Sequence, residues 1–92
     1  MKHTRKNIFF HELIGLEICI LEHSDPSLVS VCGTIVDETA KTIVIETKKG
    51  VRKRVYKEHG VYAIWLPNRE KVIIRGNQIL GRPEDRLKKM LK

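Results

Sequence analysis

The sequence predicts a small, mainly β domain, an antiparallel barrel or sandwich of about six short strands with a short helix near each end. Three observations support this. The chain has 92 residues, which suits one domain over residues 1–92. Short apolar stretches recur at regular spacing, and turn-forming residues separate them. Closing the sheet would also hide its edges, which a chain this short needs.

A first helix is expected over residues 7–14. Asn7 can cap it, and apolar side chains at positions 9, 10, 13 and 14 fall on one face. Gly15 is placed to end it in a left-handed turn. A helix this short needs something to pack on. It either plugs its own domain or docks a partner protein, and the residues leave both alternatives open.

The barrel is expected over residues 16–80. Its strands are predicted at 16–22, 28–37, 42–47, 51–57, 61–66 and 70–75. Asp25 and Pro26 provide turn chemistry between the first two strands. Gly33, in the middle of the second strand, indicates a bulge or a sharp bend.

A second helix is expected over residues 83–92. Pro83 suits the first helical position. Acidic residues at positions 84 and 85 follow it and lysines come at the end, which matches the helix dipole. The polar side of this helix is therefore cationic.

The charge is distributed unevenly along the chain. The whole sequence holds 18 Lys and Arg against 11 Asp and Glu, a formal net charge of +7, but residues 1–47 carry −3 and residues 48–92 carry +10. Such asymmetry favours a polyanionic partner, because neutralising phosphates releases condensed counterions.

The basic residues of the second half form three rows. The first lies on the predicted hairpin at 48–57, beside Tyr56, and the next strand adds Tyr62 and Trp65. Arginine and aromatic side chains together suit unpaired bases and phosphates, although Trp65 is expected in the core because its neighbours are apolar. The candidate RNA-binding residues are Lys48, Lys49, Arg52, Lys53, Arg54, Lys57, Arg69, Lys71, Arg75, Arg82, Arg86, Lys88 and Lys89.

No pattern indicates catalysis or metal binding by the protein itself. The carboxylates sit mainly at turns and helix starts, the four histidines are widely spaced, and no phosphate-binding glycine loop is present. Cys19 and Cys32 do not follow zinc spacing. They could pair only if the fold brings them together. In the absence of a signal peptide they are expected to be buried thiols in a cytoplasmic protein. No apolar stretch is long enough to span a membrane. We expect no catalytic residue, no metal and no cofactor.

Five stretches in order give the chain a family resemblance. They are His11–Leu16, Asp25–Leu28, Gly33–Thr39, Ile43–Thr47 and Gly81–Leu87. Together they resemble protein component 1 of archaeal ribonuclease P. The resemblance implies a strongly bent Sm-like barrel that binds the ribonuclease P RNA and a small zinc-ribbon protein subunit. In that family the RNA performs the cleavage that removes the 5′ leader of precursor tRNA. The protein would therefore contact the precursor tRNA only indirectly.

The resemblance also favours a docking role for the first helix. The expected partner-protein interface is Phe9, Phe10, His11, Leu13 and Ile14. The protein would be part of an endoribonuclease without being catalytic, and it would be a monomer in isolation. The alternative is a general Sm-like RNA-binding or protein-bridging module with no dedicated RNA.

Overall fold

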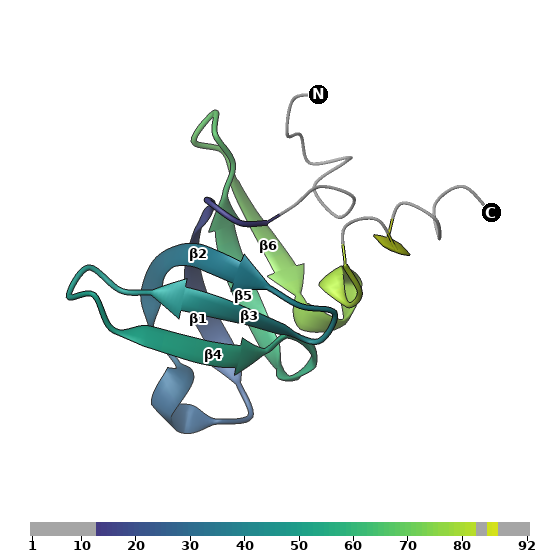
Figure 1. Cartoon of the computed structure of the whole chain (residues 1–92), viewed down its shortest axis with the longest axis horizontal. Coiled ribbons are helices and arrows are strands. Elements are labelled where there is room, and N and C mark those ends of the chain that lie inside the picture. Colours follow the sequence, from purple (N-terminus) through teal and green to yellow (C-terminus); the bar gives the residue numbers. More distant parts are fainter. Residues whose placement is uncertain (1–12, 83–84, 87–92) are drawn as a thin grey trace.

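The computed structural model describes residues 13–82, 85 and 86, and its core element is one antiparallel sheet of six strands (Figure 1). The strands are β1 (Glu17–His23), β2 (Cys32–Glu38), β3 (Thr42–Glu46), β4 (Arg52–Tyr56), β5 (Gly60–Trp65) and β6 (Lys71–Arg75). Their order across the sheet is β4-β3-β2-β1-β5-β6. The predicted mainly β class with six antiparallel strands is confirmed.

The second strand starts later than predicted, at Cys32 instead of position 28. The preceding residues form a 3-10 turn, η2 (Pro26–Leu28), because Pro26 fixes φ and the Asp25 side chain accepts from the Ser27 N–H at 3.0 Å. Ser30 then adopts a positive φ of 73°. Local turn chemistry therefore overrides the β-branched run in this segment.

Strand β2 is strongly curved (Figure 1), and its register with β3 shifts between Ile35 and Asp37. The start of the strand pairs with β1, where Gly33 lies opposite Ile18, and the part from Thr34 onward pairs with β3. A Cβ atom on Gly33 would lie 2.2 Å from the Glu46 carbonyl oxygen. The missing side chain is what allows the backbone of β3 to come so close to Gly33.

The edge strands β4 and β6 are brought together at one end by two 3-10 turns. Turn η3 (Lys57–His59) follows β4, and turn η4 (Gly76–Ile79) follows β6. A Cβ atom on Gly76 would lie 1.2 Å from the Lys57 carbonyl oxygen, so the two turns are in backbone contact. The sheet thus curls around its core and is closed at this end by turns, with no pairing between β4 and β6 in the described residues.

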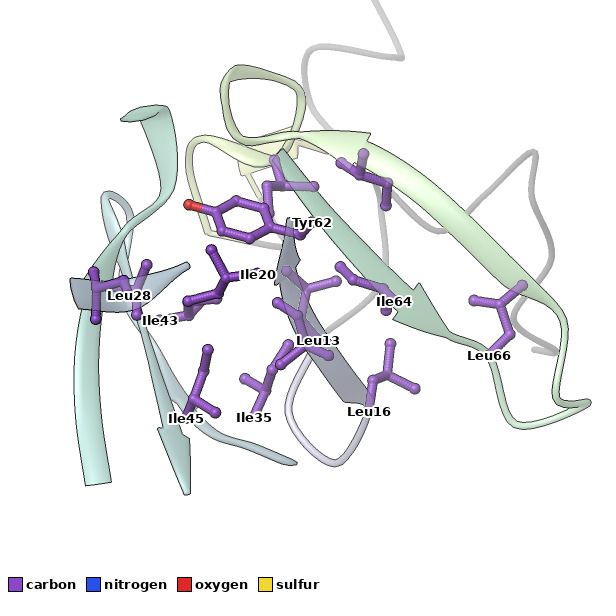
Figure 2. Close-up of a cluster of buried hydrophobic side chains, with 14 residues drawn as sticks. Leu13, Leu16, Ile20, Leu28, Ile35, Ile43, Ile45, Tyr62, Ile64 and Leu66 are labelled. Carbon is purple, nitrogen blue, oxygen red and sulfur yellow. The ribbon is translucent and has the colours of Figure 1, made fainter. Parts of the chain in front are cut away.

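The core lies inside the curled sheet and consists mainly of isoleucine (Figure 2). Alternate positions of each strand supply it, which is the period-two pattern of strands with one buried face. Its members are Leu13, Leu16, Ile18, Ile20, Leu28, Ile35, Ile43, Ile45, Val55, Tyr62, Ile64, Leu66, Ile74 and Ile79. Tyr62 donates its hydroxyl hydrogen to the Tyr56 and Lys57 carbonyl oxygens, each at 2.9 Å, and burial raises the pKa of Tyr62 to about 12.

The predicted terminal helices fall largely outside the described residues. Positions 7–12 of the first helix are not described, and Leu13 and Ile14 belong to a turn in which the Leu16 N–H donates to the Leu13 carbonyl at 3.1 Å. Gly15 has the expected left-handed φ, 96°. Of the second helix only residues 85 and 86 are described, and both are helical. No helix among the described residues has the length and apolar character needed to cross a membrane.

The expectation of two buried thiols is wrong. Cys19 of β1 lies directly opposite Cys32 of β2, and their sulfur atoms form a disulfide. Cys32 is exposed and Cys19 is half-buried. The hairpin register brings the two residues to a Cα separation of 4.1 Å, so the condition under which they could pair is met.

Candidate nucleic-acid interface

Most of the predicted RNA-binding side chains lie on the surface. The exposed residues are Lys48, Lys49, Arg52, Arg54, Arg69, Lys71, Arg75 and Arg82, and Lys53 is half-buried. Lys88 and Lys89 lie outside the described residues. Lys57 and Arg86 are buried.

The turn between β3 and β4 presents two of these lysines at a hairpin tip. Gly50 adopts φ 82° and donates its N–H to the Thr47 carbonyl at 2.9 Å, while the Thr47 side chain accepts from the Val51 N–H at 3.3 Å. These bonds fix the loop that carries Lys48 and Lys49. The tip therefore holds two ammonium groups in solvent at a defined place.

The other exposed basic side chains concentrate on the two edge strands. Arg52 and Arg54 lie on β4, and Lys71 and Arg75 lie on β6. Arg52 is partly engaged, because its Nε donates to the Glu46 carboxylate at 2.9 Å in an exposed ion pair. The two strands approach each other at their ends, where η3 and η4 pack together. Charged edges also discourage further strand addition, which is a purely structural reason for them.

An aromatic cluster stands at this meeting point. Tyr56 is 58 % exposed, and its ring lies 6.4 Å from that of His59, which in turn lies 6.3 Å from His23. His23 accepts from the Asp25 N–H at Nδ1 and therefore donates from Nε2 to the Tyr56 carbonyl. Hydrogen bonds from Ser27 hold the pKa of Asp25 below its usual value. In the sequence these histidines are only widely spaced, because the fold alone places them beside Tyr56.

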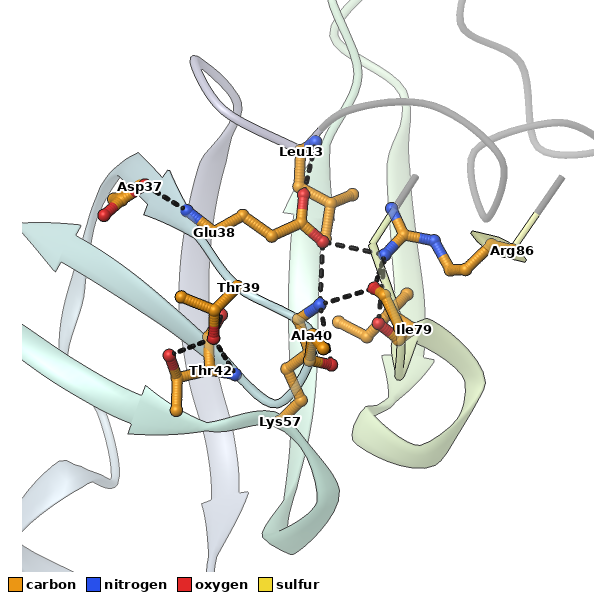
Figure 3. A network of polar contacts seen from close by, with 10 residues as sticks. Leu13, Asp37, Glu38, Thr39, Ala40, Thr42, Lys57, Ile79 and Arg86 are labelled. Atoms are coloured by element: carbon orange, nitrogen blue, oxygen red, sulfur yellow. Dashed lines mark hydrogen bonds and ion pairs between the residues drawn. The ribbon is translucent and has the colours of Figure 1, made fainter. Parts of the chain in front are cut away.

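Two of the predicted RNA-binding cations are instead part of a buried network (Figure 3). Lys57 Nζ and Arg86 Nη1 each donate to Glu38 Oε2 at 2.7 Å, and the three side chains are at most 3 % exposed. Both cations also donate to the Gly81 carbonyl, and Arg86 donates to the Ile79 carbonyl at 3.1 Å. The prediction that Lys57 and Arg86 face RNA is therefore wrong, because their charges are neutralised inside the protein.

Burial also changes the acid–base chemistry of Lys57. Desolvation lowers its pKa from the ordinary value, and the hydrogen bond and charge of Glu38 oppose that fall. Glu38 Oε1 accepts from the Leu13 N–H at 3.2 Å. One carboxylate thus joins β2, η3 and the two ends of the described chain.

The predicted partner-protein interface is only partly described. Leu13 has no exposed surface and belongs to the core, so its assignment to a docking surface is wrong. Ile14 is 41 % exposed and remains available. Phe9, Phe10 and His11 lie outside the described residues. Leu13 therefore packs into the core of its own domain, which is the other of the two roles considered for this segment.

The remaining aromatic residues divide between the core and the surface. Tyr62 is fully buried and cannot stack on a base. Trp65, expected in the core, is only half-buried and lines a groove on the surface. In the part of the chain that the structure describes, no three His, Cys, Asp or Glu side chains are placed to hold a metal ion. Fold and surface together define a small basic β domain that presents cations and exposed aromatic rings.

Comparison with known proteins identifies the family. The sequence model for "Ribonuclease P/MRP, subunit p29" matches residues 6–89. The chain is 62 % identical to ribonuclease P protein component 1 of Staphylothermus marinus over the full length of both, and 40 % identical to that of Methanocaldococcus jannaschii over 97 % of this chain and 93 % of the relative. A solved structure, described as "Structure of Mth11: A homologue of human RNase P protein Rpp29", aligns with a TM-score of 0.61 and 36 % identity over 82 % of this chain and 96 % of that one.

The chain therefore belongs to the ribonuclease P/MRP subunit p29 family, as the sequence resemblance indicated. It is a protein subunit of ribonuclease P and takes part in tRNA processing.

Proposed function

We propose that the chain is a non-catalytic subunit that binds the ribonuclease P RNA and a second, zinc-ribbon protein subunit, and so supports removal of the 5′ leader from precursor tRNA. The observation that carries this proposal is the set of exposed cations on the hairpin tip and on both edge strands. Solvated cations at fixed positions suit a structured polyanion.

The RNA itself would perform the cleavage. Two of the carboxylates have local structural partners: Asp25 accepts from Ser27, and Asp37, in β2, accepts from the Glu38 N–H at 2.8 Å. Glu38 is occupied by two buried cations. These groups are committed to the fold, which supports a binding role over a catalytic one.

The protein partner would contact the side of the domain where the chain enters the core. Ile14 is exposed there, directly after the segment that holds Phe9, Phe10 and His11. An exposed apolar side chain beside a short apolar segment suits a contact with another subunit.

The test is the salt dependence of RNA binding. Each phosphate contact contributes roughly 0.7–0.9 to the slope of log affinity against log salt, so replacing Arg54, Lys71 and Arg75 by alanine should flatten that slope by roughly 2–3. The control is Lys41→Ala, an exposed lysine of the β2–β3 turn outside the three basic rows. A slope that is the same in the triple variant and the control would contradict RNA binding through the edge strands.

A further inference from the structure

A groove of about 1040 Å³ lies between the β3–β4 hairpin and the start of the β1–β2 pair. Its volume is at the upper end of the range for small-molecule sites, so a nucleotide fits within it. The groove is lined by parts of the chain that are far apart in sequence, including Cys19 and Cys32, the residues around Lys48, and Trp65. Nothing in the proposed function assigns it an occupant.

The apolar part of the lining is formed by Trp65, the Cys19–Cys32 disulfide and Val51. Val51 is 50 % exposed and Trp65 is half-buried, so both retain open apolar surface. The Trp65 indole N–H donates to no described residue, although a partly buried tryptophan usually finds an acceptor. The ring thus offers a π-face and a free donor.

The charged part of the lining favours an anion. Lys48, Lys49 and Lys53 stand on the hairpin side. Of the two carboxylates, Glu46 is already paired with Arg52 outside the groove lining, which leaves the three lysines uncompensated on that side. Glu17 lies opposite Trp65 in the sheet register. Its carboxylate repels phosphate and accepts hydrogen bonds, so that end of the groove suits the edge of a base.

A second hollow adjoins the first across the tryptophan. Trp65 and Glu17 line both, and Arg69 stands in the second. The ring is therefore flanked by lysines on one side and by an arginine on the other. This arrangement matches a chain whose phosphates run past the ring on both sides while a base lies against it.

Resting on the proposed function, we propose that this groove binds an unpaired segment of the RNA, with one base stacked on Trp65 and the flanking phosphates held by Lys48, Lys49 and Lys53 on one side and by Arg69 on the other. A paired helix would present backbone and not a base face. The site would add stacking to the phosphate contacts of the edge strands. It would thus direct the protein to a looped or bulged element of the RNA.

Trp65 is the single tryptophan of the chain, so its fluorescence reports on this groove alone. The full-length protein is titrated with ribonuclease P RNA and, separately, with a short single-stranded oligonucleotide. Both nucleic acids are expected to quench the Trp65 emission. For the RNA, the concentration at half-maximal quenching should equal the dissociation constant measured by filter binding. Trp65→Leu should weaken RNA binding on the order of tenfold, while Trp65→Phe should retain most of the affinity.

A second variant covers the case in which Trp65→Leu does not fold. Lys48→Ala combined with Lys49→Ala changes only the exposed hairpin tip, and it should move the quenching midpoint for the oligonucleotide to higher concentration, unlike Lys41→Ala. RNA binding of normal affinity without quenching, and unaffected by these changes, would overturn the groove and leave the proposed function intact. An absence of RNA binding by any assay would overturn both.

Discussion

The buried carboxylate of Glu38 gives the sharpest prediction of stability. In Glu38→Gln the side chain keeps its shape and one carbonyl oxygen but loses its charge. Lys57 and Arg86 would then be two buried cations, each at most 3 % exposed, with only neutral acceptors. Removing one partner of a buried ion pair costs roughly 3–5 kcal/mol. Since small domains have about 5–15 kcal/mol in total, the variant should be close to unfolding.

Urea denaturation at pH 7 measures this change. The matched control is Glu46→Gln, which removes the same charge from an exposed pair with Arg52 and should cost about 0–1 kcal/mol. The midpoint of Glu38→Gln should fall well below that of the control, with the slope unchanged. A loss as small as that of the control would refute the reasoning, since it would mean that the buried charges do not depend on this carboxylate.

The pH dependence of the same variant is a second readout. The pKa of Lys57 is lowered by burial and supported by Glu38, so it should fall further in Glu38→Gln. At a pH between the lowered pKa of folded Lys57 and its ordinary value of 10.5, Lys57 is protonated in the unfolded chain but not in the folded one. In that range the free energy of unfolding rises with pH. The deficit of Glu38→Gln relative to the wild type should therefore shrink as the solution becomes alkaline. A deficit that is constant with pH would contradict a charged Lys57.

Three further changes test the fold. Gly33→Ala places a Cβ atom 2.2 Å from the Glu46 carbonyl oxygen, and thermal denaturation should show a loss of at least about 1–3 kcal/mol. An unchanged stability would mean that β3 can move away from β2 at no cost. Burial raises the pKa of Tyr62 from 10.0 to about 12, so the wild type should lose about 3 kcal/mol of stability as the pH rises through this range. Tyr62→Phe has no phenol to ionise and should not show this loss. An unchanged alkaline limb would contradict this. Reducing the Cys19–Cys32 disulfide, whose partners are 13 residues apart, should cost about 3 kcal/mol, and a Cys19→Ser, Cys32→Ser double variant should be insensitive to reductant.

Local signals account for most of the fold. Alternating apolar residues and turn chemistry place all six strands, because these features depend on neighbours in sequence. Gly33 marks a close approach of the β3 backbone. The late start of β2 was missed because the turn at Pro26 and the positive φ of Ser30 replace strand geometry.

The sequence also contains a local signal for the disulfide. A hairpin centred on Asp25 and Pro26 places Cys19 opposite Cys32, which is the observed register. The alternation of the fourth strand likewise puts Lys57 on the same face as Val55, which is buried. At both places the strand period outweighs residue type, since it decides which face each side chain occupies.

The remaining parts of the site depend on distant residues. Arg86 is 48 positions from Glu38, and no local pattern links the two. The groove beside Trp65 arises only when the hairpin tip, the disulfide and the end of β5 come together. Sequence patterns find which residues are basic, but the tertiary fold decides which of them remain in solvent.

The shared carboxylate also brings distant parts of the chain together. Leu13 and Arg86 bond to the two oxygens of Glu38, so the segments that enter and leave the domain start from one point. Any molecule attached to one segment is therefore held at a high effective concentration near the other. A protein partner bound beside the entry segment would therefore lie close to any RNA bound beside the exit segment. The spacing between the two segments would then depend on one buried carboxylate, that of Glu38.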